Sequence, residues 1–286
     1  MWRNRESLEV REKKQSEKEE RQKRKQEKAD KKRNRREERK MRKYVDLDKI
    51  LENNPLLRQK KIICFDLYGT LIHRPNSLKY LKKILKLVWA EPLKDYRKIA
   101  QTKPKEEIEK EYKSKHGSNK IIEMLIEAFQ NHTEDEALKT EVFWDTIEVL
   151  KKLQKKGYKI ALISNLSQDF EKPLRDLITP EFQFDYEARS YDVWFMKPNP
   201  KIFQKILDDA NKDTDEDSKY EMKDLLMIWD SITDDVDWAR WVWMDAILIK
   251  RRKDNSEKTG QISYNEEKNL ITVRTLKALY KILGVK

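Results

Sequence analysis

Four polar positions in this sequence have the chemistry and spacing to work together. Asp66, Ser164 and Asp230 each stand at the end of a short apolar run, and Lys197 stands at the start of an amphipathic stretch. A carboxylate can act as a nucleophile and form a covalent acyl intermediate. Two carboxylates also offer the hard oxygen ligands that Mg²⁺ takes alongside waters and a substrate phosphate oxygen. A lysine ammonium can neutralise negative charge that develops on a substrate and hold two carboxylates close together.

The apolar runs predict buried strands that would bring these residues to one place. The runs predicted as strands are 61–65, 158–164, 184–188, 224–229 and 246–250. Helices are predicted at 145–156, 172–178, 200–210 and 236–244, polar loops at 211–221 and 251–268, and a last strand and helix within 271–283. Strands that alternate with helices favour βαβ units, and ligands bind at the carboxyl edge of such a parallel sheet. We therefore expect a three-layer, Rossmann-like α/β fold.

This alternation stops between the first and second predicted strands. Residues 76–141 are highly charged and contain amphipathic stretches at 77–90 and 118–130, so an all-helical insert is predicted there. The α/β core would then comprise residues 58–75 and 142–286. Residues 46–57 are predicted as a linker.

The first 45 residues hold most of the excess charge. Residues 1–43 contain 20 Lys or Arg and 10 Asp or Glu, within a chain whose net charge is +12. They lack Pro and Gly, and acids precede bases by four residues in pairs such as Glu17–Arg21 and Glu27–Lys31, which predicts a solvated helix. One interpretation is a basic arm for nucleic acid, the ribosome or an acidic membrane surface. The other is a charged, solubilising extension without a specific partner.

Composition excludes several classes of protein. The single cysteine, Cys64, excludes a disulfide framework and a cysteine-based zinc site, and it is typical of a reducing, cytoplasmic setting. The sequence contains no apolar run of 18 residues, so no membrane span is expected. The polar first ten residues do not resemble a secretory signal. We expect a cytoplasmic protein.

Four motifs make the sequence resemble the haloacid dehalogenase (HAD) superfamily. They are FDLYGTL at 65–71, LISN at 162–165, KPNPKIF at 197–203 and WDSITDD at 229–235. They occur in the order that the family shows, and the resemblance spans about residues 58–286. The helical insert takes the place of the family's C1-type cap. The resemblance implies a Mg²⁺-dependent phosphohydrolase that acts on a small phosphorylated substrate through an aspartyl-phosphate.

The resemblance also implies a role for each matching residue. Asp66 matches the nucleophile, and Lys197 matches the lysine of the third motif. Thr70 and Ser164 match the groups that orient the nucleophile and the phosphoryl group. Asn165, beside Ser164, is expected to bind the substrate.

The same resemblance implies a Mg²⁺ site. Asp66 and Asp230 match metal-binding acids, and Asp235 matches the second acid of the last motif. The backbone carbonyl of Tyr68 matches a further ligand. For Asp234 we favour a role as an electrostatic cap of the next helix.

Tyr68 departs from the pattern of the family's phosphatases. These usually carry a second Asp two residues after the nucleophile, which protonates the leaving oxygen and later activates water. A phenol with a pKa near 10 is a poor base at pH 7, and losing such catalysis typically costs roughly 10²–10⁴-fold in rate. Dehalogenases of the family share the D-x-Y-G-T pattern but lack both the metal and an acid at the position of Asp230. Three functions stay open: a weakened phosphohydrolase, an inactive or weak HAD domain that serves as a binding module with a basic arm, and a carbon–halogen hydrolase.

Glycine is scarce in this chain and tryptophan is abundant. The sequence has 5 Gly and 8 Trp, whereas ordinary usage would give roughly 20 Gly. Tryptophans that stand where the family pattern has Gly are Trp144, Trp194, Trp229, Trp238 and Trp243. Gly serves such places through close backbone approach, positive φ or a helix C-cap. Either these are UGA codons meant as glycine, or the tryptophans are real and crowd the loop at Asp230.

Overall fold

The computed structural model divides the chain into two compact units, residues 1–46 and 47–286. Residues 1–46 lie outside the described part, so the predicted N-terminal helix is not described. The ranges that the structure describes are 47–73, 91–117, 139–231, 244–251 and 262–285, with residues 120, 123, 124 and 127 between them.

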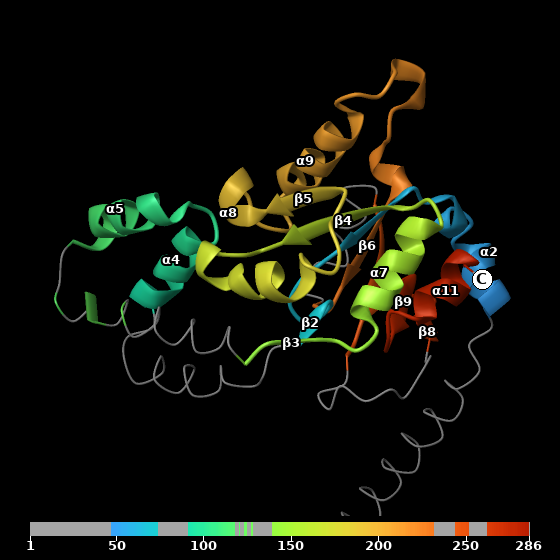
Figure 1. The fold of residues 1–286 in the computed structure, drawn as a ribbon, viewed down its shortest axis with the longest axis horizontal. Helices are drawn as coiled ribbons and strands as arrows, with labels where there is room; N and C mark the ends of the chain where they lie inside the picture. The colour runs from blue at the N-terminus through green and yellow to red at the C-terminus, as the bar shows by residue number, and fades with distance from the viewer. Residues whose placement is uncertain are drawn as a thin grey trace, which may run out of the picture. The chain divides into compact units, whose positions relative to one another are not determined.

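A seven-stranded sheet forms the core of the second unit (Figure 1). Its strands, in sheet order, are β5 (Tyr186–Arg189), β4 (Lys159–Ser164), β1 (Ile62–Phe65), β6 (Leu225–Trp229), β7 (Asp245–Ile249), β9 (Leu270–Val273) and β8 (Ile262–Asn265). Every neighbouring pair is parallel except β8 and β9. All four residues of β1 are fully buried, as expected of a central strand covered on both faces. The predicted α/β fold with a parallel sheet is confirmed.

Helices cover both faces of this sheet, which makes three layers (Figure 1). Helix α9 (Pro200–Asn211) buries Ile202, Phe203 and Ile206 in one cluster with Ile62 and Cys64 of β1. Neighbouring side chains along a strand point to opposite faces, and α7 (Thr146–Lys155) and α11 (Ala278–Leu283) lie on the other side. Among the described helices, none is long and apolar enough to cross a membrane.

The structure corrects the predicted loop at 251–268. Residues 262–265 form β8, which pairs antiparallel with β9 through registers such as Ile262 with Val273. The sequence ISYN alternates apolar and polar residues, as a partly covered edge strand does. Its polar neighbours concealed this short alternation. The predicted strand at 184–188 is also displaced, because β5 spans Tyr186–Arg189.

Within the predicted linker 46–57, the described residues 47–57 are largely helical. They contain α2 (Leu47–Asn53), whose Ile50 is fully buried. A short 3₁₀ turn follows at Leu57–Gln59, and its Leu57 is buried as well. Seven residues make about two helical turns, which is too short for an apolar periodicity to be recognised in the sequence.

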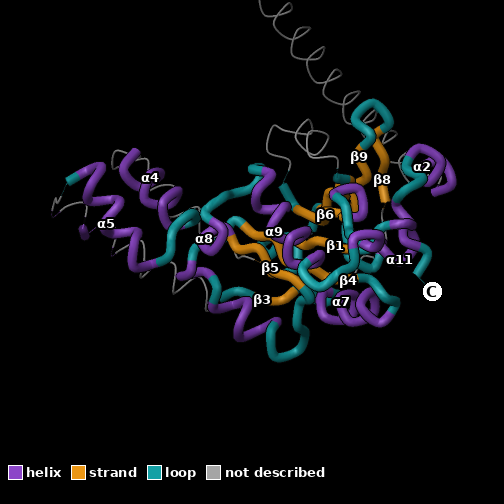
Figure 2. Tube along the Cα trace, turned by 90° about the horizontal axis from the view of Figure 1, so that it is seen from above, coloured by secondary structure: helices purple, strands orange, loops and turns teal. Residues whose placement is uncertain are grey.

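The part of the predicted insert that the structure describes is mainly helical. Helices α4 (Glu91–Ala100) and α5 (Lys105–His116) lie side by side, with the rings of Tyr96 and Tyr112 packed edge to face at 5.5 Å (Figure 2). Strands β2 (Ile72–His73) and β3 (Glu141–Val142) pair antiparallel at the base of the insert. The chain therefore leaves the core and re-enters it side by side. Most of the amphipathic stretches at 77–90 and 118–130 lie outside the described residues.

Trp194 is a tryptophan in a backbone conformation that favours glycine. It follows the short helix α8 (Ser190–Val193) with φ = 65°, in the left-handed region, and its side chain is 49% exposed. Trp144 and Trp229 do not have positive φ. Trp229 ends β6 and packs in the core at 8% exposure. The backbone reason for glycine is thus present at one of these three positions, and Trp238 and Trp243 lie outside the described residues.

Cys64 is a core residue of the central strand. Its side chain is fully buried among Ile62, Ala161 and Met227. Burial raises the pKa of the thiol far above its usual value. Because the thiolate is the reactive form, this cysteine is chemically inert in the folded protein.

Candidate active site

The polar residues predicted to meet at one sheet edge lie at the carboxyl ends of three neighbouring strands. Asp66 follows β1, Ser164 ends β4 and Asp230 follows β6, with β1 in the middle of the three. Ser164 is buried. The backbone N–H of Asp66 donates to the carbonyl of Ile228 at 2.9 Å, which fixes the start of the loop after β1 against β6. The sheet topology therefore puts Asp66 at the centre of the edge.

Lys197 lies directly against Asp66. Its Nζ donates to Asp66 Oδ1 at 2.6 Å and to the carbonyl of Ile163 at 2.9 Å. The lysine side chain is 9% exposed and that of Asp66 is 16% exposed. Charge-assisted hydrogen bonds shielded from water in this way are about twice as strong as neutral ones. The ammonium group is thus held next to the carboxylate predicted to act as the nucleophile.

Asn165 fixes the backbone of Lys197. Its Nδ2 donates to the carbonyl of Lys197 at 3.0 Å, and its Oδ1 accepts from the N–H of Lys197 at 2.6 Å. Both polar atoms of the Asn165 side-chain amide are therefore hydrogen-bonded to the backbone of Lys197. The substrate-binding role predicted for Asn165 stays a prediction, and the structure gives this side chain a positioning task. Its own carbonyl accepts from Gln101 Nε2, in the turn after α4, at 3.3 Å.

Asp230 packs on the backbone of Gly69. Gly69 has φ = 80°, and a Cβ built on it would lie 2.1 Å from Asp230 Oδ2. No residue with a side chain fits there without moving the carboxylate. The surrounding protein desolvates Asp230, and together with the charge of Asp66 this raises the pKa of Asp230 to about 6, against the opposing effect of Lys197. A cation beside the two carboxylates would relieve this cost.

The residues of this edge suit a Mg²⁺ ion. Asp66 and Asp230 supply two hard oxygen donors, and Mg²⁺ is usually held by one or two carboxylates with waters and substrate oxygens. Among the residues that the structure describes, no group of three His, Cys, Asp or Glu could form a closed cage. The hydroxyl of Thr70 is buried without a hydrogen-bond partner in this part of the chain, so the loop has a polar atom to spare for a ligand. Asp234 and Asp235 lie outside the described residues.

The hydroxyl of Tyr68 is hydrogen-bonded to the backbone of the segment after β4. It donates to the carbonyl of Phe170 at 2.8 Å, and the two rings pack edge to face at 6.1 Å. A phenol whose proton is held by a backbone carbonyl is a poor acid or base for a substrate. Its side chain instead ties the loop after β1 to the loop after β4.

Two residues with buried side chains, Arg251 and Asp145, hold the loop after β1, and the sequence singled out neither. Arg251 donates from Nε and Nη2 to the carbonyl of Thr70, at 2.9 and 2.7 Å, and from Nη1 to Asp145 Oδ1 at 2.6 Å. Arg251 directly follows a predicted strand, which is the criterion that identified Asp66 and Asp230. It was missed because it opens the range predicted as the polar loop 251–268.

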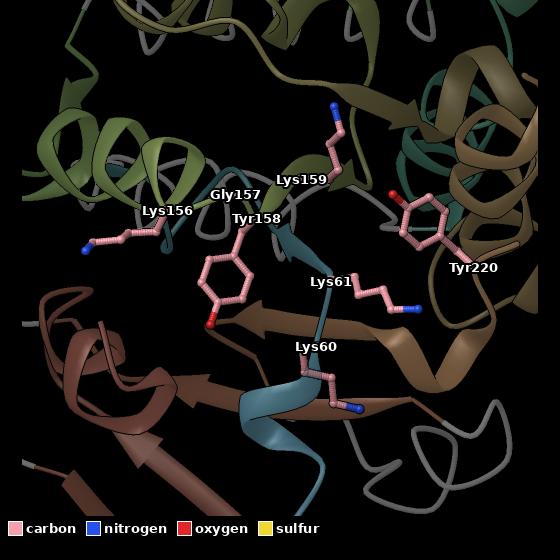
Figure 3. A pocket seen from close by; sticks show the side chains of 7 residues that line it. All are labelled: Lys60, Lys61, Lys156, Gly157, Tyr158, Lys159 and Tyr220. Atoms are coloured by element: carbon pink, nitrogen blue, oxygen red, sulfur yellow. The ribbon is translucent and has the colours of Figure 1, made fainter. Parts of the chain in front are cut away.

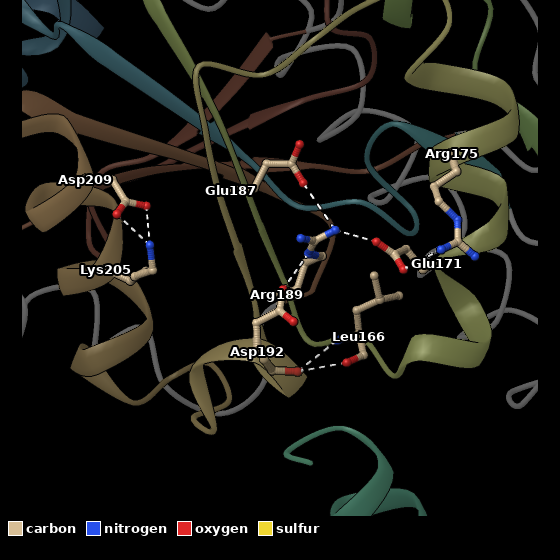
Figure 4. A network of polar contacts seen from close by, with 9 residues as sticks. Leu166, Glu171, Arg175, Glu187, Arg189, Asp192, Lys205 and Asp209 are labelled. Carbon is tan, nitrogen blue, oxygen red and sulfur yellow. Dashed lines mark hydrogen bonds and ion pairs between the residues drawn. The ribbon is translucent and has the colours of Figure 1, made fainter. Parts of the chain in front are cut away.

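A second polar network braces the loop after β4 (Figure 4). Arg189, at the end of β5, pairs with Glu171 and with Asp192, and lies 3.7 Å from Glu187. Burial raises the pKa of Glu187. Glu171 also pairs with Arg175 at 3.2 Å. These contacts join the 166–175 segment, which directly follows Asn165, to β5 and α8.

A surface pocket of about 400 Å³ lies at the opposite ends of the strands (Figure 3). It is lined by Lys60, Lys61, Lys156, Gly157, Tyr158, Lys159 and Tyr220. Its lysine side chains point in different directions (Figure 3). Lys60 pairs with Asp245 at 2.6 Å and Lys159 with Asp185 at 3.1 Å. Divergent and paired lysines do not make an anion site, so we place no function there.

The parallel sheet and its edge of carboxylates, lysine and hydroxyls define a class of hydrolase. The family model for haloacid dehalogenase-like hydrolases matches residues 60–242, which is more than half of the chain. The chain belongs to this family. No curated protein matches its sequence.

Solved structures similar to this chain include several members of the same family. A HAD phosphatase from Thermococcus onnurineus is 23% identical over 78% of this chain and 98% of its own, with a TM-score of 0.47. The HAD-hydrolase YfnB from Bacillus subtilis, bound to magnesium, is 16% identical over 79% and 99%, with a TM-score of 0.47. A HAD family enzyme from Bacteroides thetaiotaomicron, in complex with magnesium and inorganic phosphate, is 18% identical over 67% and 94%, with a TM-score of 0.44.

Proposed function

We propose that this hydrolase is a Mg²⁺-dependent phosphohydrolase that transfers a phosphoryl group from a small substrate to Asp66 and then to water. The observation that best supports the proposal is the position of Lys197 Nζ, 2.6 Å from Asp66 Oδ1, with Asp230 packed against Gly69 of the same loop. A carboxylate nucleophile, a fixed cation and a second carboxylate on one sheet edge match the needs of phosphoryl transfer, which depends mainly on positioning and charge.

The chain's own residues divide the work as follows. Lys197 binds Oδ1 of Asp66, and we assign the attack on phosphorus to Oδ2. As the bond to the leaving oxygen breaks, the ammonium of Lys197 offsets the negative charge on the phosphoryl oxygens. Thr70 and Ser164 supply the hydroxyls that orient the transferred group.

Mg²⁺ would complete the site. Asp66 and Asp230, with Asp235 and the carbonyl of Tyr68, are the ligands that we propose. When bound, the ion supplies charge stabilisation for the phosphoryl oxygens and compensates the two carboxylates.

Tyr68 sets the expected rate and substrate. Because the Tyr68 hydroxyl donates a hydrogen bond to the Phe170 carbonyl, we propose no general acid or base at this position. The rate of hydrolysis would therefore be roughly 10²–10⁴-fold below that of the family's phosphatases. Substrates whose leaving group needs no proton, such as aryl or acyl phosphates, are therefore favoured. We extend the proposal to a cytoplasmic location.

The test is turnover of p-nitrophenyl phosphate by the full chain, with Mg²⁺ and with EDTA. Asp66→Asn should abolish Mg²⁺-dependent turnover. Asp176→Asn, which changes an exposed carboxylate paired with Lys172, is the matched control and should retain it. If the turnover of the wild type does not exceed that of Asp66→Asn, the proposed enzymatic activity is refuted.

Two other functions remain candidates because of Tyr68. A weak or inactive domain would bind phosphate-containing ligands without hydrolysing them. Such a protein would bind orthovanadate in the presence of Mg²⁺ and yet show no hydrolysis of p-nitrophenyl phosphate. A carbon–halogen hydrolase would release halide from a 2-haloacid in the presence of EDTA. Asp230 argues against the halide reaction, since dehalogenases of the family lack an acid there.

The basic segment 1–45 is proposed to bind nucleic acid or the ribosome. Its charge supports this, because phosphate contacts by Lys and Arg release counterions and make binding fall with salt. The full chain should retain RNA at low salt, and the logarithm of the binding constant should fall linearly with the logarithm of the salt concentration. Deletion of residues 1–45 should abolish RNA binding. Unchanged retention after the deletion, or retention that does not vary with salt, would remove this proposal.

A further inference from the structure

We propose that Arg251 is a positioning residue of the active site, which sets the conformation of Thr70 without touching the substrate. The inference rests on the proposed function for its effect on turnover. Its structural part, that Arg251 holds the loop after β1, stands on geometry alone.

Arg251 grips Thr70 by a forked contact. Nε and Nη2 donate to the same carbonyl at 2.9 and 2.7 Å. Only a planar guanidinium presents two parallel donors at this spacing, whereas a lysine ammonium is a compact point charge on a flexible stem. Both position and direction of the Thr70 carbonyl are therefore set by the side chain.

Three groups fix the guanidinium, and they are the Thr70 carbonyl, the Asp145 carboxylate and the Phe143 ring. Asp145 is fully buried and accepts from Arg251 Nη1 at 2.6 Å. The other oxygen of Asp145 accepts from the N–H of Leu276 at 2.7 Å, which ties the carboxylate to the C-terminal segment. The ring of Phe143 lies 4.3 Å from the guanidinium carbon. An Arg side chain held on one face and at both ends is a rigid strut.

Arg251 holds a loop that is closed by its own backbone hydrogen bonds. The N–H of Gly69 donates to the carbonyl of Ile72, and the N–H of Ile72 donates to that of Leu67, both within 3.0 Å. This tight turn places Gly69 under Asp230 and leaves the Thr70 hydroxyl buried without a partner in the described chain. A rotation at Thr70 would turn that hydroxyl and lift Gly69 from Asp230. Arg251 thus supports a geometry that matters most in the transition state.

The test compares Arg251→Lys with Arg274→Lys in the full chain. Arg274 is a nearby exposed arginine that donates to the carbonyl of Lys250 at 3.3 Å, so it is a matched control. We expect Arg251→Lys to lower kcat for p-nitrophenyl phosphate by about tenfold or more, with KM within about twofold, because the loop after β1 is no longer held in the geometry that the transition state needs. Hydrogen exchange of amides within 66–72 should also quicken. Arg274→Lys should change neither.

A control variant that is destabilised outside the loop after β1 tests whether a loss of stability alone lowers kcat. Ile206→Val in α9 removes a buried methylene from a core cluster that contains no residue of 66–72, and it should lower the melting temperature without lowering kcat. If Arg251→Lys does not fold, Phe143→Leu is the second variant. It removes the ring stacked on the guanidinium and leaves no buried charge unpaired, and it should change kcat and exchange in the same direction.

The outcomes distinguish this inference from the proposed function. If the wild type shows no turnover that depends on Asp66, the proposed function falls and hydrogen exchange alone decides, with faster exchange in 66–72 supporting the strut. If the wild type is active, a kcat for Arg251→Lys equal to that of Arg274→Lys overturns the inference. Unchanged exchange in 66–72 overturns it in either case.

Discussion

Replacing Lys197 by Met removes the positive charge at the centre of the site and keeps the length of the side chain. Lys197 Nζ donates to Asp66 Oδ1 at 2.6 Å and to the Ile163 carbonyl, and both charged side chains are largely buried. A hydrogen bond between such charged groups contributes about 1.5–3 kcal/mol. For a unit of this size, 1 kcal/mol shifts the melting temperature by about 2–4 °C. We therefore expect a loss of about 3–12 °C at pH 7.5 in EDTA.

The loss should depend on pH and on Mg²⁺. Lys197 opposes the rise in the pKa of Asp230, so its removal raises that pKa further above 6. At pH 5 Asp230 is protonated in both proteins, the repulsion from Asp66 is absent, and the difference between them shrinks. Mg²⁺ at pH 7.5 should also restore part of the loss, because the ion replaces the missing positive charge.

The assay is thermal unfolding followed by circular dichroism, with Lys151→Met as the control. Lys151 forms an exposed ion pair with Glu181 at 3.0 Å, which is worth at most about 1 kcal/mol. A cycle of Asp66→Asn, Lys197→Met and the double variant should give a coupling energy of about 1.5 kcal/mol or more. A loss no larger than that of Lys151→Met and independent of pH would refute the reasoning.

Three further perturbations have expected results. In the protein without metal, stability should fall as pH rises from about 4 to about 6, because the raised pKa of Asp230 makes the folded state hold its proton longer than the unfolded state does; Asp230→Asn should abolish this dependence in thermal scans. Gly69→Ala should cost roughly 1–3 kcal/mol and weaken stabilisation by Mg²⁺ in the same scans, because its Cβ would lie 2.1 Å from Asp230 Oδ2; equal Mg²⁺ stabilisation of both proteins would contradict this. Trp194→Gly should leave the melting temperature nearly unchanged, because relief of the left-handed backbone, roughly 1–2 kcal/mol, offsets the lost contact between the Trp194 ring and Lys103 Nζ at 3.8 Å. Trp229→Gly should instead lower the free energy of unfolding by roughly 3–5 kcal/mol, because it removes a core side chain. Equal losses in the two variants would show that the backbone of Trp194 is unstrained.

The parallel sheet and the candidate site at its edge could be predicted because their signals are local. The strands β1, β4 and β6 are continuous apolar runs, and each ends abruptly in a polar residue. Since parallel strands share a carboxyl edge, the placement of Asp66, Ser164 and Asp230 follows from one rule. Lys197 precedes α9, and it was singled out because it stands where an amphipathic helix was predicted to begin.

The elements that were missed depend on contacts between distant parts of the chain. Helix α2 buries Ile50 in the core and pairs Lys49 with Glu266 at 2.7 Å, whereas β8 pairs with the next strand and was missed because polar residues surround its short alternation. Arg251 and Asp145 are 106 residues apart, and no local pattern links them. The hydrogen bond from Tyr68 to Phe170 likewise joins residues 102 apart, so the sequence could show that an acid was missing but not what its replacement does.

The glycine deficit has one structural counterpart. Trp194 occupies a left-handed position, where a bulky residue is strained and glycine is not. Trp229 lies within a strand, and its glycine preference came from the family pattern and not from its backbone. Codons decide the question, and UGG at Trp194 would show that this chain tolerates the strain.

The inert thiol of Cys64 makes this chain suited to site-specific labelling. Because the sequence has one cysteine and that cysteine is fully buried, a new cysteine on the surface would be the only one that a maleimide reaches. One label in the turn between α4 and α5, near Gln101, and one on α9 would report the distance between insert and core. Spectroscopy could then follow that distance during binding of Mg²⁺ or orthovanadate in otherwise unmodified protein.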